Sequence, residues 1–238
     1  MVADLETLRL KVRPLFDLAA PADALPAYYA LYYDPTRSRL HVHEDAAGRV
    51  DGFVVVCQTG QRLFQPTVVL RTPNAFAAVE LLRQALTPGR PYYLVTTPDL
   101  REAVAEVADV QQSEINRIFN LDLVRFGPVV NVLVVAEQGL GGRPRFVIRS
   151  QGKSASEAGV NWHSPHFAEV FVRTEPAAQR RGWGRAVLSA CTTWVIRSSR
   201  QPLYIVGDRN RPSIALADAV GYVDTGAREF VADVVCRP

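Results

Sequence analysis

The segment from Gln179 to Gly184 has the composition and neighbours of a ligand-binding turn. It follows an apolar run, Phe167 to Thr174, and leads into an apolar-periodic segment, Val187 to Ile196. This order predicts a strand, a turn and the start of a helix. Such a turn presents several backbone N–H groups at the positive end of the helix dipole, where a bound anion is stabilised. The pattern therefore predicts a site for a diphosphate.

The glycines and arginines of this turn also suit a diphosphate. Gly182 and Gly184 would let the main chain approach phosphate oxygens without an intervening Cβ. Three guanidinium groups nearby can add charge-assisted hydrogen bonds, those of Arg180, Arg181 and Arg185. Taken alone, the turn could equally be a plain strand-to-helix connection. It lacks the Lys-Ser/Thr ending of a P-loop and the three-glycine spacing of a dinucleotide-binding turn.

The elements around the turn belong to a series that occurs twice. Helical spacing across 15–33 precedes the first series, and a second helical stretch across 113–119 follows it. The first series predicts strands at 39–43, 52–58 and 67–70, a helix at 74–86, a strand at 92–96 and a helix at 99–110. The second, from 145 to 220, predicts strands at 145–150, 156–160 and 167–174, a helix from 184 to about 198, a strand at 203–206 and a helix at 213–220. Further strands are predicted before it, at 129–136 with a turn at 139–142, and after it, at 227–234.

The repeated order suggests a tandem duplication, with domains at 1–127 and 128–238. The helix entries are alike, Val68 to Thr72 in the first half and Val170 to Thr174 in the second. Coincidence is the alternative, because short apolar strands are common in such domains. The loop that matches the turn, Thr72 to Phe76, has no glycine. We therefore expect the first copy to be degenerate and to have lost the phosphate site.

Composition narrows the classes of function. The chain has 238 residues, 48% of them hydrophobic, which is enough for one large domain or two small ones. The net charge of +3 suits an anionic ligand, and the absence of a dense basic run with aromatics argues against a nucleic-acid partner. Three scattered cysteines argue against a disulfide framework. The segment from Met1 to Glu6 does not look like a signal peptide, and no apolar stretch is long enough to span a membrane, so we expect a soluble cytoplasmic protein.

The C-terminal half resembles the GCN5-related N-acetyltransferase (GNAT) superfamily. Gln179 to Gly184 match the Q/R-x-x-G-x-G/A element of that family, and Pro176 precedes it as in many members. Further on, Asn210-x-x-Ser213-x-x-Leu216 and Gly221-Tyr222 resemble the Asn…Leu…Gly-Phe/Tyr ending of the family. The likeness covers roughly residues 129–235 in order and spacing. It implies an α/β (α+β) GNAT fold, with a mixed and mostly antiparallel sheet flanked by helices, in two tandem units.

The resemblance also implies a ligand, acetyl-CoA, and the residues that bind it. The pantetheine arm would contact the end of the strand, at Val172, Arg173 and Thr174, and the Asn210–Ser213 segment. The pyrophosphate would be bound by Gln179, Arg180, Arg181, Gly182, Trp183, Gly184 and Arg185. Main-chain N–H groups near Val172 are candidates for polarising the thioester carbonyl. No metal is implied.

Two positions, 169 and 217, concern the proton transfers that accompany acetyl transfer. Glu169 is a lone acid in an apolar strand, and Phe167-Ala168-Glu169 looks like the Phe-Ala-Glu strand of histone-type members, so we take Glu169 as the candidate general base. A water-facing carboxylate on an edge strand is the alternative. Ala217 stands where many members carry the tyrosine that protonates the thiolate, and the nearest tyrosine, Tyr222, is expected in the core.

Other polar residues are weaker candidates. His163 and His166 precede the strand and could act at the cleft edge, although surface histidines are the simpler interpretation. His41 and His43 share one face of a strand, but no distant third ligand for a metal is evident.

The sequence therefore predicts an acetyl-CoA-dependent N-acetyltransferase that acts on the amine of a small molecule or peptide by direct attack in a ternary complex. A non-catalytic acyl-CoA-binding module is the alternative function. A homodimer remains open.

Overall fold

The computed structural model describes residues 4–60, 62, 64–139 and 142–238, and it divides into two compact units. Unit 1 comprises Met1–Asn116 with Arg228–Pro238, and unit 2 comprises Arg117–Ala227. These units differ from the expected domains, 1–127 and 128–238, because the last strand returns to unit 1. The start of the expected N-terminal segment, 1–3, and part of the expected turn, 140–141, lie outside the described residues. Over the described chain, every helix is too short or too polar to cross a membrane.

Unit 1 contains three antiparallel strands followed by a helix, a strand and a helix. Its elements are α1 (Leu5–Val12), α2 (Ala24–Ala27), a π-helical turn (Tyr28–Tyr32), β1 (Ser38–Glu44), β2 (Val50–Cys57), β3 (Thr67–Arg71), α3 (Ala75–Ala85), β4 (Pro91–Thr96), α4 (Arg101–Val107), and parts of β5 (Ala108–Leu121) and β11 (Tyr222–Cys236). Strands β1, β2 and β3 are antiparallel neighbours, and β3 pairs in parallel with β4.

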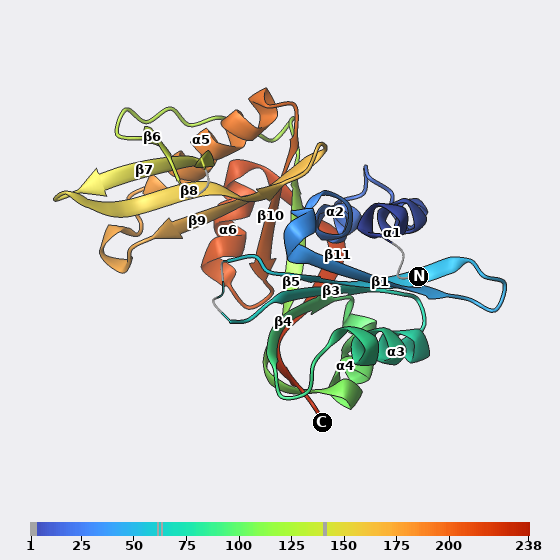
Figure 1. Ribbon diagram of the computed structural model, residues 1–238. Helices are drawn as coiled ribbons and strands as arrows, with labels where there is room; N and C mark the ends of the chain where they lie inside the picture. Colours follow the sequence, from blue (N-terminus) through green and yellow to red (C-terminus); the bar gives the residue numbers. More distant parts are fainter. Residues whose placement is uncertain (1–3, 61, 63, 140–141) are drawn as a thin grey trace. The chain divides into compact units, whose positions relative to one another are not determined.

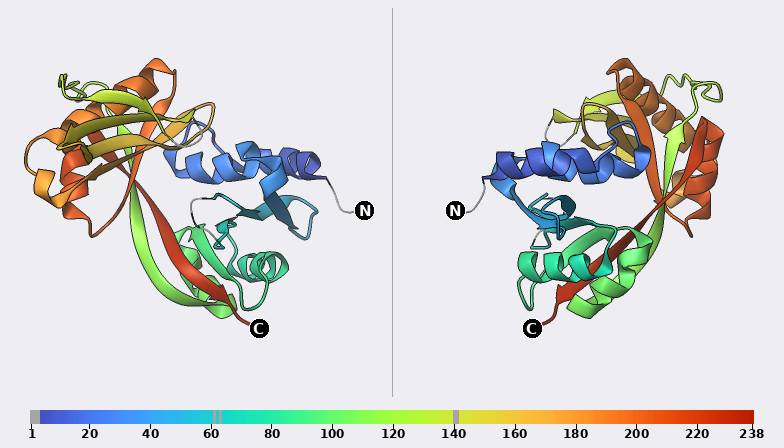
Figure 2. Two further views of the ribbon diagram at one scale, coloured as in Figure 1. Left: turned by 60° about the vertical axis from the view of Figure 1, so that its left-hand side comes forward. Right: turned by 90° about the vertical axis from the view of Figure 1, so that its right-hand side faces the viewer.

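Strand alternation places helices on both faces of unit 1 (Figure 1, Figure 2). Val54 and Val56 of β2 pack in a core with α3 and α4. Phe53 points to the other face, where its ring meets that of Phe16 edge-on at 5.3 Å between centroids. Because both faces are covered, β2 reads as a nearly continuous apolar run.

Unit 2 repeats the order of elements seen in unit 1. Its elements are β6 (Val135–Gln138), β7 (Pro144–Ser150), β8 (Lys153–His163), β9 (Phe167–Thr174), α5 (Trp183–Arg197), β10 (Gln201–Gly207) and α6 (Arg211–Val220), with parts of β5 and β11. Strands β6 to β9 are antiparallel neighbours, and β9 pairs in parallel with β10. Helices α5 and α6 share one core with the even-numbered residues of β9, Ala168 and Val170.

Strands β9 and β10 separate before either ends. Their parallel register runs from Phe167 opposite Gln201 to Val170 opposite Tyr204. Beyond that pair, β9 continues to Thr174 and β10 to Gly207. The separation opens the sheet of unit 2 beside the N-termini of α5 and α6.

Two predicted elements are wrong, and one is interrupted. The expected helix at 113–119 lies inside β5, because pairing in the sheet overrides the helical spacing of Ile115, Ile118 and Phe119. The expected strand at 129–136 is regular only from Val135, since Asn131 forms a turn in which its side chain accepts the N–H of Leu133. The helical pattern at 15–33 forms short helical pieces around Pro21 and Pro26.

The last strand explains the division into units. The C-terminal half of β11 pairs antiparallel with β4, from Phe230 opposite Thr96 to Val235 opposite Pro91. We expected only one late strand, at 227–234, in the second domain, whereas β11 spans Tyr222–Cys236 and contributes to both units.

Candidate functional site

One pocket of unit 2, with a volume of about 600 Å³, lies where β9 ends and where α5 and α6 begin. Its walls come from two stretches of the chain: residues 172–185, which hold the end of β9, the turn and the start of α5, and residues 210–216 at the start of α6. The lining residues are Val172, Thr174, Ala178, Gln179, Arg180, Gly182, Trp183, Gly184, Arg185, Asn210, Pro212, Ser213 and Leu216. Of the described residues predicted to bind the ligand, Arg173 and Arg181 are the two that do not line this pocket.

The Gln179–Gly184 turn has two residues in the left-handed region and lies against the pocket. Arg180 and Gly182 both have positive φ angles, 60° and 74°. Gly182 is the N-cap of α5, and its carbonyl accepts the first intrahelical bond, from the Ala186 N–H at 3.0 Å. The N–H groups of residues 182–185 precede that bond, so the helix geometry leaves them available to an anion.

The two glycines have different functions. A Cβ on Gly182 would meet no atom within 4 Å, so its requirement for glycine is the left-handed φ angle. A Cβ on Gly184 would lie 3.0 Å from Thr174 Oγ1 and 3.5 Å from Leu216 Cδ2. The second glycine therefore allows α5 to start close against β9 and α6. We had assigned both glycines to the approach of the phosphates.

The arginines near the pocket differ in whether they line it. Arg180 and Arg185 line it. The Arg181 guanidinium lies 5.1 Å from the centroid of the Trp183 ring, which is a cation–π contact. Arg173 forms an exposed ion pair with Glu175 at 3.2 Å. The side chains of Arg181, predicted to bind the pyrophosphate, and of Arg173, predicted to lie beside the pantetheine arm, thus make these contacts outside the pocket lining.

Asn210 and Ser213 form the N-terminus of α6. The Asn210 side-chain oxygen accepts the Ser213 N–H at 3.2 Å, which caps the helix. The Ser213 hydroxyl is hydrogen-bonded to the hydroxyl of Tyr204 on β10, at 2.5 Å. Tyr204 was missed at the sequence level, because a tyrosine in an apolar strand looks like an ordinary core residue and only the fold brings α6 beside it.

Glu169 lies on the opposite face of β9 from Val172 and Thr174, because strand residues alternate. It is half-buried, and its Oε1 accepts the Asn161 Nδ2–H at 2.7 Å. Asn161 occupies a bulge of β8 between Val160 and Trp162, which turns its amide toward the carboxylate. Glu169 itself does not line the pocket described above.

The remaining candidates occupy structural positions. Tyr222 is fully buried, and its hydroxyl is 2.7 Å from that of Thr192, as expected for a core residue. Ala217 is also fully buried. His163 follows the bulge. Its pKa is lowered, mainly by burial and to a smaller extent by the positive charges of Arg200 and Arg143.

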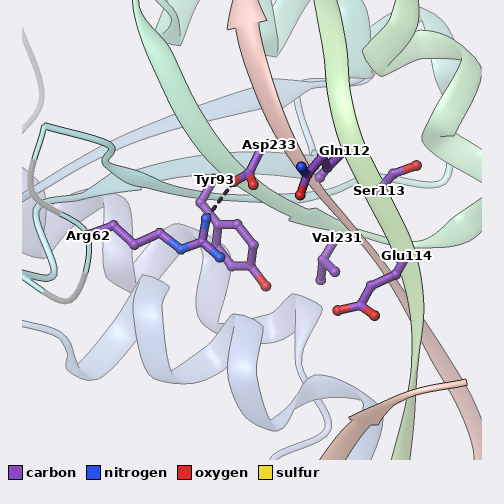
Figure 3. A pocket seen from close by; sticks show the side chains of 8 residues that line it. Arg62, Tyr93, Gln112, Ser113, Glu114, Val231 and Asp233 are labelled. Carbon is purple, nitrogen blue, oxygen red and sulfur yellow. Dashed lines mark hydrogen bonds and ion pairs between the residues drawn. The ribbon is translucent and has the colours of Figure 1, made fainter. Parts of the chain in front are cut away.

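Unit 1 contains a smaller pocket of about 280 Å³ (Figure 3). The Arg62 guanidinium lies 4.1 Å from the Tyr93 ring centroid and 2.5 Å from Asp233 Oδ1. Gln65 also donates to Asp233, at 2.8 Å. Because the cation and the acid neutralise each other, the pocket does not select a ligand by charge through this pair.

His43 is held by carboxylates rather than arranged for a metal. Its Nδ1 is 2.5 Å from Asp51 Oδ1, and its Nε2 is 3.5 Å from Glu80 Oε2. The hydrogen bond to Asp51 raises the His43 pKa despite partial desolvation, whereas burial lowers that of His41. The described chain holds no group of three or more His, Cys, Asp or Glu residues placed to bind a metal ion.

Comparison with known proteins supports the resemblance found in the sequence. The family model described as FR47-like protein matches residues 161–231, which include the turn and the start of α6. No curated protein matches the chain.

Several solved structures are similar in fold. A GCN5-related N-acetyltransferase-like protein from Streptococcus suis 89/1591 aligns with a TM-score of 0.63 at 13% identity, over 98% of this chain and 100% of that one. A GCN5-related N-acetyltransferase from Kribbella flavida gives 0.61 at 15% identity, over 89% and 93%. A tandem GNAT protein from the clavulanic acid biosynthesis pathway gives 0.54 at 17% identity, over 98% and 93%.

These likenesses extend over nearly the whole chain, so they concern both units. They confirm the predicted fold class, a mixed sheet flanked by helices in two tandem units. The described residues therefore have the fold of GNAT proteins, and the FR47-like family model matches the segment from 161 to 231.

Proposed function

We propose that unit 2 binds acetyl-CoA and transfers its acetyl group to an amine. The observation that carries the proposal is the single pocket in which the Gln179–Gly184 turn, the end of β9 and the start of α6 meet. The GNAT fold suggests acyl transfer in general; the acetyl donor and the amine acceptor are our proposal.

The residues present fit this ligand. The N–H groups of residues 182–185, with Arg180 and Arg185, would bind the pyrophosphate. The edge of β9 at Val172 and Thr174 is where β10 has moved away, so its backbone can bond the amides of a pantetheine arm. Asn210 and Ser213 stand across the same pocket. When bound, the ligand supplies an activated acetyl thioester.

Glu169 is our proposed general base. It lies on the face of β9 away from the pocket, so an amine would reach the thioester from the side opposite the nucleotide. The hydrogen bond from Asn161 to Oε1 fixes the position of the carboxylate, which would accept a proton from the amine. Main-chain N–H groups near Val172 would polarise the carbonyl.

Unit 1 is proposed to be a degenerate copy. Its elements follow the same order, but the loop before α3 has Asn74 as a side-chain N-cap and lacks glycine. The cap satisfies the Phe76 N–H, at 2.9 Å, so the loop uses one of the amides that unit 2 presents to a ligand. We further infer a cytoplasmic protein whose acceptor is a small molecule or a peptide, without nucleic-acid or membrane partners; a homodimer remains compatible.

The test combines binding and turnover. Calorimetry should show that CoA binds, and CoA release should be detected with at least one member of a panel of amines. Glu169→Gln should lower kcat by about 10²- to 10⁴-fold with CoA affinity unchanged. Glu137→Gln, in an ion pair with Arg149 on the outer strands, is the matched control and should retain activity.

The outcomes separate the two candidate functions. Absence of CoA binding would falsify the proposal altogether. Binding without turnover on any amine would favour the non-catalytic acyl-CoA-binding module, for which the buried Ala217 in place of the usual tyrosine is the supporting observation.

A further inference from the structure

Two hydroxyl groups meet at the wall of the ligand pocket. Ser213 lines the pocket, whereas Tyr204 lies behind it and is only 3% exposed. Their oxygens are 2.5 Å apart, which is short for a hydrogen bond between hydroxyls. The pair joins β10 to the first turn of α6.

The burial of Tyr204 decides the direction of this bond. A buried phenol must donate its proton to some acceptor, and Ser213 Oγ is the partner that the described structure provides. Desolvation raises the pKa of Tyr204, so the phenol stays protonated at neutral pH. When Tyr204 donates to Ser213, the Ser213 hydrogen is left to point elsewhere, and the open side of Ser213 is the pocket.

The Tyr204–Ser213 pair also lies beside the point where β9 and β10 separate. Tyr204 is the last residue of β10 that pairs with β9, opposite Val170, and the strands separate beyond it. Val172 and Ser213 line the pocket that opens there. Ala217, one turn further along α6, is fully buried and carries no donor.

We propose that the Ser213 hydroxyl, oriented and polarised by Tyr204, donates a hydrogen bond to the sulfur that leaves when the acetyl group is transferred. The inference rests on the proposed function, and it assigns the leaving-group role that Ala217 cannot fill.

The atoms and charges of this step balance without a proton transfer from the pair. The amine nitrogen forms a bond to the carbonyl carbon, the C–S bond breaks, and its electron pair stays on sulfur. The amine gives its proton to Glu169, and the thiolate takes a proton from water on release. A thiol, with a pKa of about 8.5 in cysteine, is a stronger acid than a phenol at about 10, so complete transfer from Tyr204 would be uphill. A charge-assisted hydrogen bond is therefore the favourable form of assistance.

Binding measurements test the inference without turnover. The affinities for CoA and for desulfo-CoA, which lacks the sulfur, are compared by calorimetry between pH 7 and pH 10. In the parent protein, CoA should gain affinity over desulfo-CoA as the thiol ionises. Ser213→Ala should reduce that gain about tenfold, because the thiolate loses a charge-assisted hydrogen bond. Binding of desulfo-CoA should be unchanged.

Kinetics supply the second readout. Ser213→Ala should lower kcat by about 10- to 100-fold with little change in KM for acetyl-CoA, and Ser213→Thr, which keeps the hydroxyl, should restore most of it. Tyr204→Phe should lower kcat by a smaller factor. Tyr222→Phe is the matched control, because it removes another buried tyrosine hydroxyl, bonded to Thr192 in the core, and should leave kcat and the CoA preference unaltered.

The results distinguish failure of this inference from failure of the proposed function. If CoA binds and turnover occurs but Ser213→Ala changes neither the thiolate preference nor kcat, the inference is wrong and the proposed function survives. An equal loss in Tyr204→Phe and Tyr222→Phe would also overturn it, since that would indicate a structural effect of either hydroxyl. If the parent protein does not bind CoA, the proposed function itself fails.

Discussion

Gly184 starts α5 so close to Thr174 of β9 that a Cβ on residue 184 would lie 3.0 Å from Thr174 Oγ1. This distance is tighter than ordinary van der Waals contact, and Leu216 of α6 closes the other side at 3.5 Å. The contact ties together three of the segments that line the pocket.

Gly184→Val should therefore displace the start of α5. Overpacking of this kind costs about 1–3 kcal/mol, and the displaced amides should weaken CoA binding by about tenfold or more. Calorimetry and thermal unfolding measure the two effects. Gly127→Val is the control, since a Cβ there meets no atom within 4 Å and the position is outside the pocket. Equal affinities for the two variants would show that the close approach is irrelevant to binding.

The neighbouring residues Arg180 and Arg181 should contribute unequally to binding. Arg180 lines the pocket, whereas Arg181 stacks on Trp183. Arg180→Gln should lower CoA affinity about tenfold, through loss of a charge-assisted contact, and the effect should shrink at high salt. Arg181→Gln should lower it less than threefold, since Arg181 does not line the pocket and acts through its general charge and its contact with Trp183. Titrations at two ionic strengths measure both, and the reverse ranking would contradict the geometry.

The histidines of β1 should give opposite pH dependences of stability. The pKa of His43 is raised, with Asp51 as the main cause and Glu80 and Asp45 adding to it, so the folded state binds the proton more tightly than the unfolded state. The stabilisation from His43 is complete below about pH 6.5 and is lost as the pH rises through the folded pKa. The pKa of His41 is lowered by burial, with Arg39 adding to it, so its contribution falls as the pH drops below about 6.5.

Urea denaturation between pH 5 and pH 8.5 measures these slopes. Relative to the parent protein, His43→Gln should be most destabilised at low pH, and His41→Gln should be relatively more stable there. Parallel curves for the parent and the His43→Gln variant would refute the role of the Asp51 contact.

Glu229 and Arg71 form a buried electrostatic pair in unit 1. Glu229 is 1% exposed, and its Oε1 has no hydrogen-bond partner among the described residues. Desolvation raises its pKa, and the charge of Arg71 opposes the rise. Glu229→Ala should destabilise the protein by about 3 kcal/mol, because it removes the largest favourable charge from the largely buried Arg71 and leaves only the weaker effects of Asp23 and Asp99.

Replacing both residues by methionine should return stability to within about 1 kcal/mol of the parent value. Urea denaturation of Glu229→Met, Arg71→Met and the double methionine variant completes a double-mutant cycle. Additive losses would mean that the two charges do not interact.

Much of the candidate site was predictable because its signals are local. The Gln179–Gly184 turn depends on a left-handed glycine, and the Asn210 cap spans three residues, so neighbouring residues suffice to specify both. Strand β9 was predicted over its whole length, Phe167–Thr174, because it is apolar and bounded by turn residues on both sides.

Other features depend on contacts between distant segments. The polar residues after α4 could form a helix or a strand, and pairing with other strands makes them part of β5. The sequence could not show that Arg181 would stack on Trp183 while Arg180 lines the pocket. Both are exposed arginines in one turn, and their orientation follows from the positive φ angles of Arg180 and Gly182.

The sequence by itself determined the resemblance to GNAT proteins, the order of elements in each half and the segment that forms the phosphate-type turn, because each is encoded by short-range patterns of apolar residues and glycine. Only the tertiary structure decided that Tyr204 would meet Ser213, that the Asn161 amide would bond Glu169, and that the end of β11 would join unit 1. These outcomes depend on strand register and helix packing, which bring together residues that no local pattern connects.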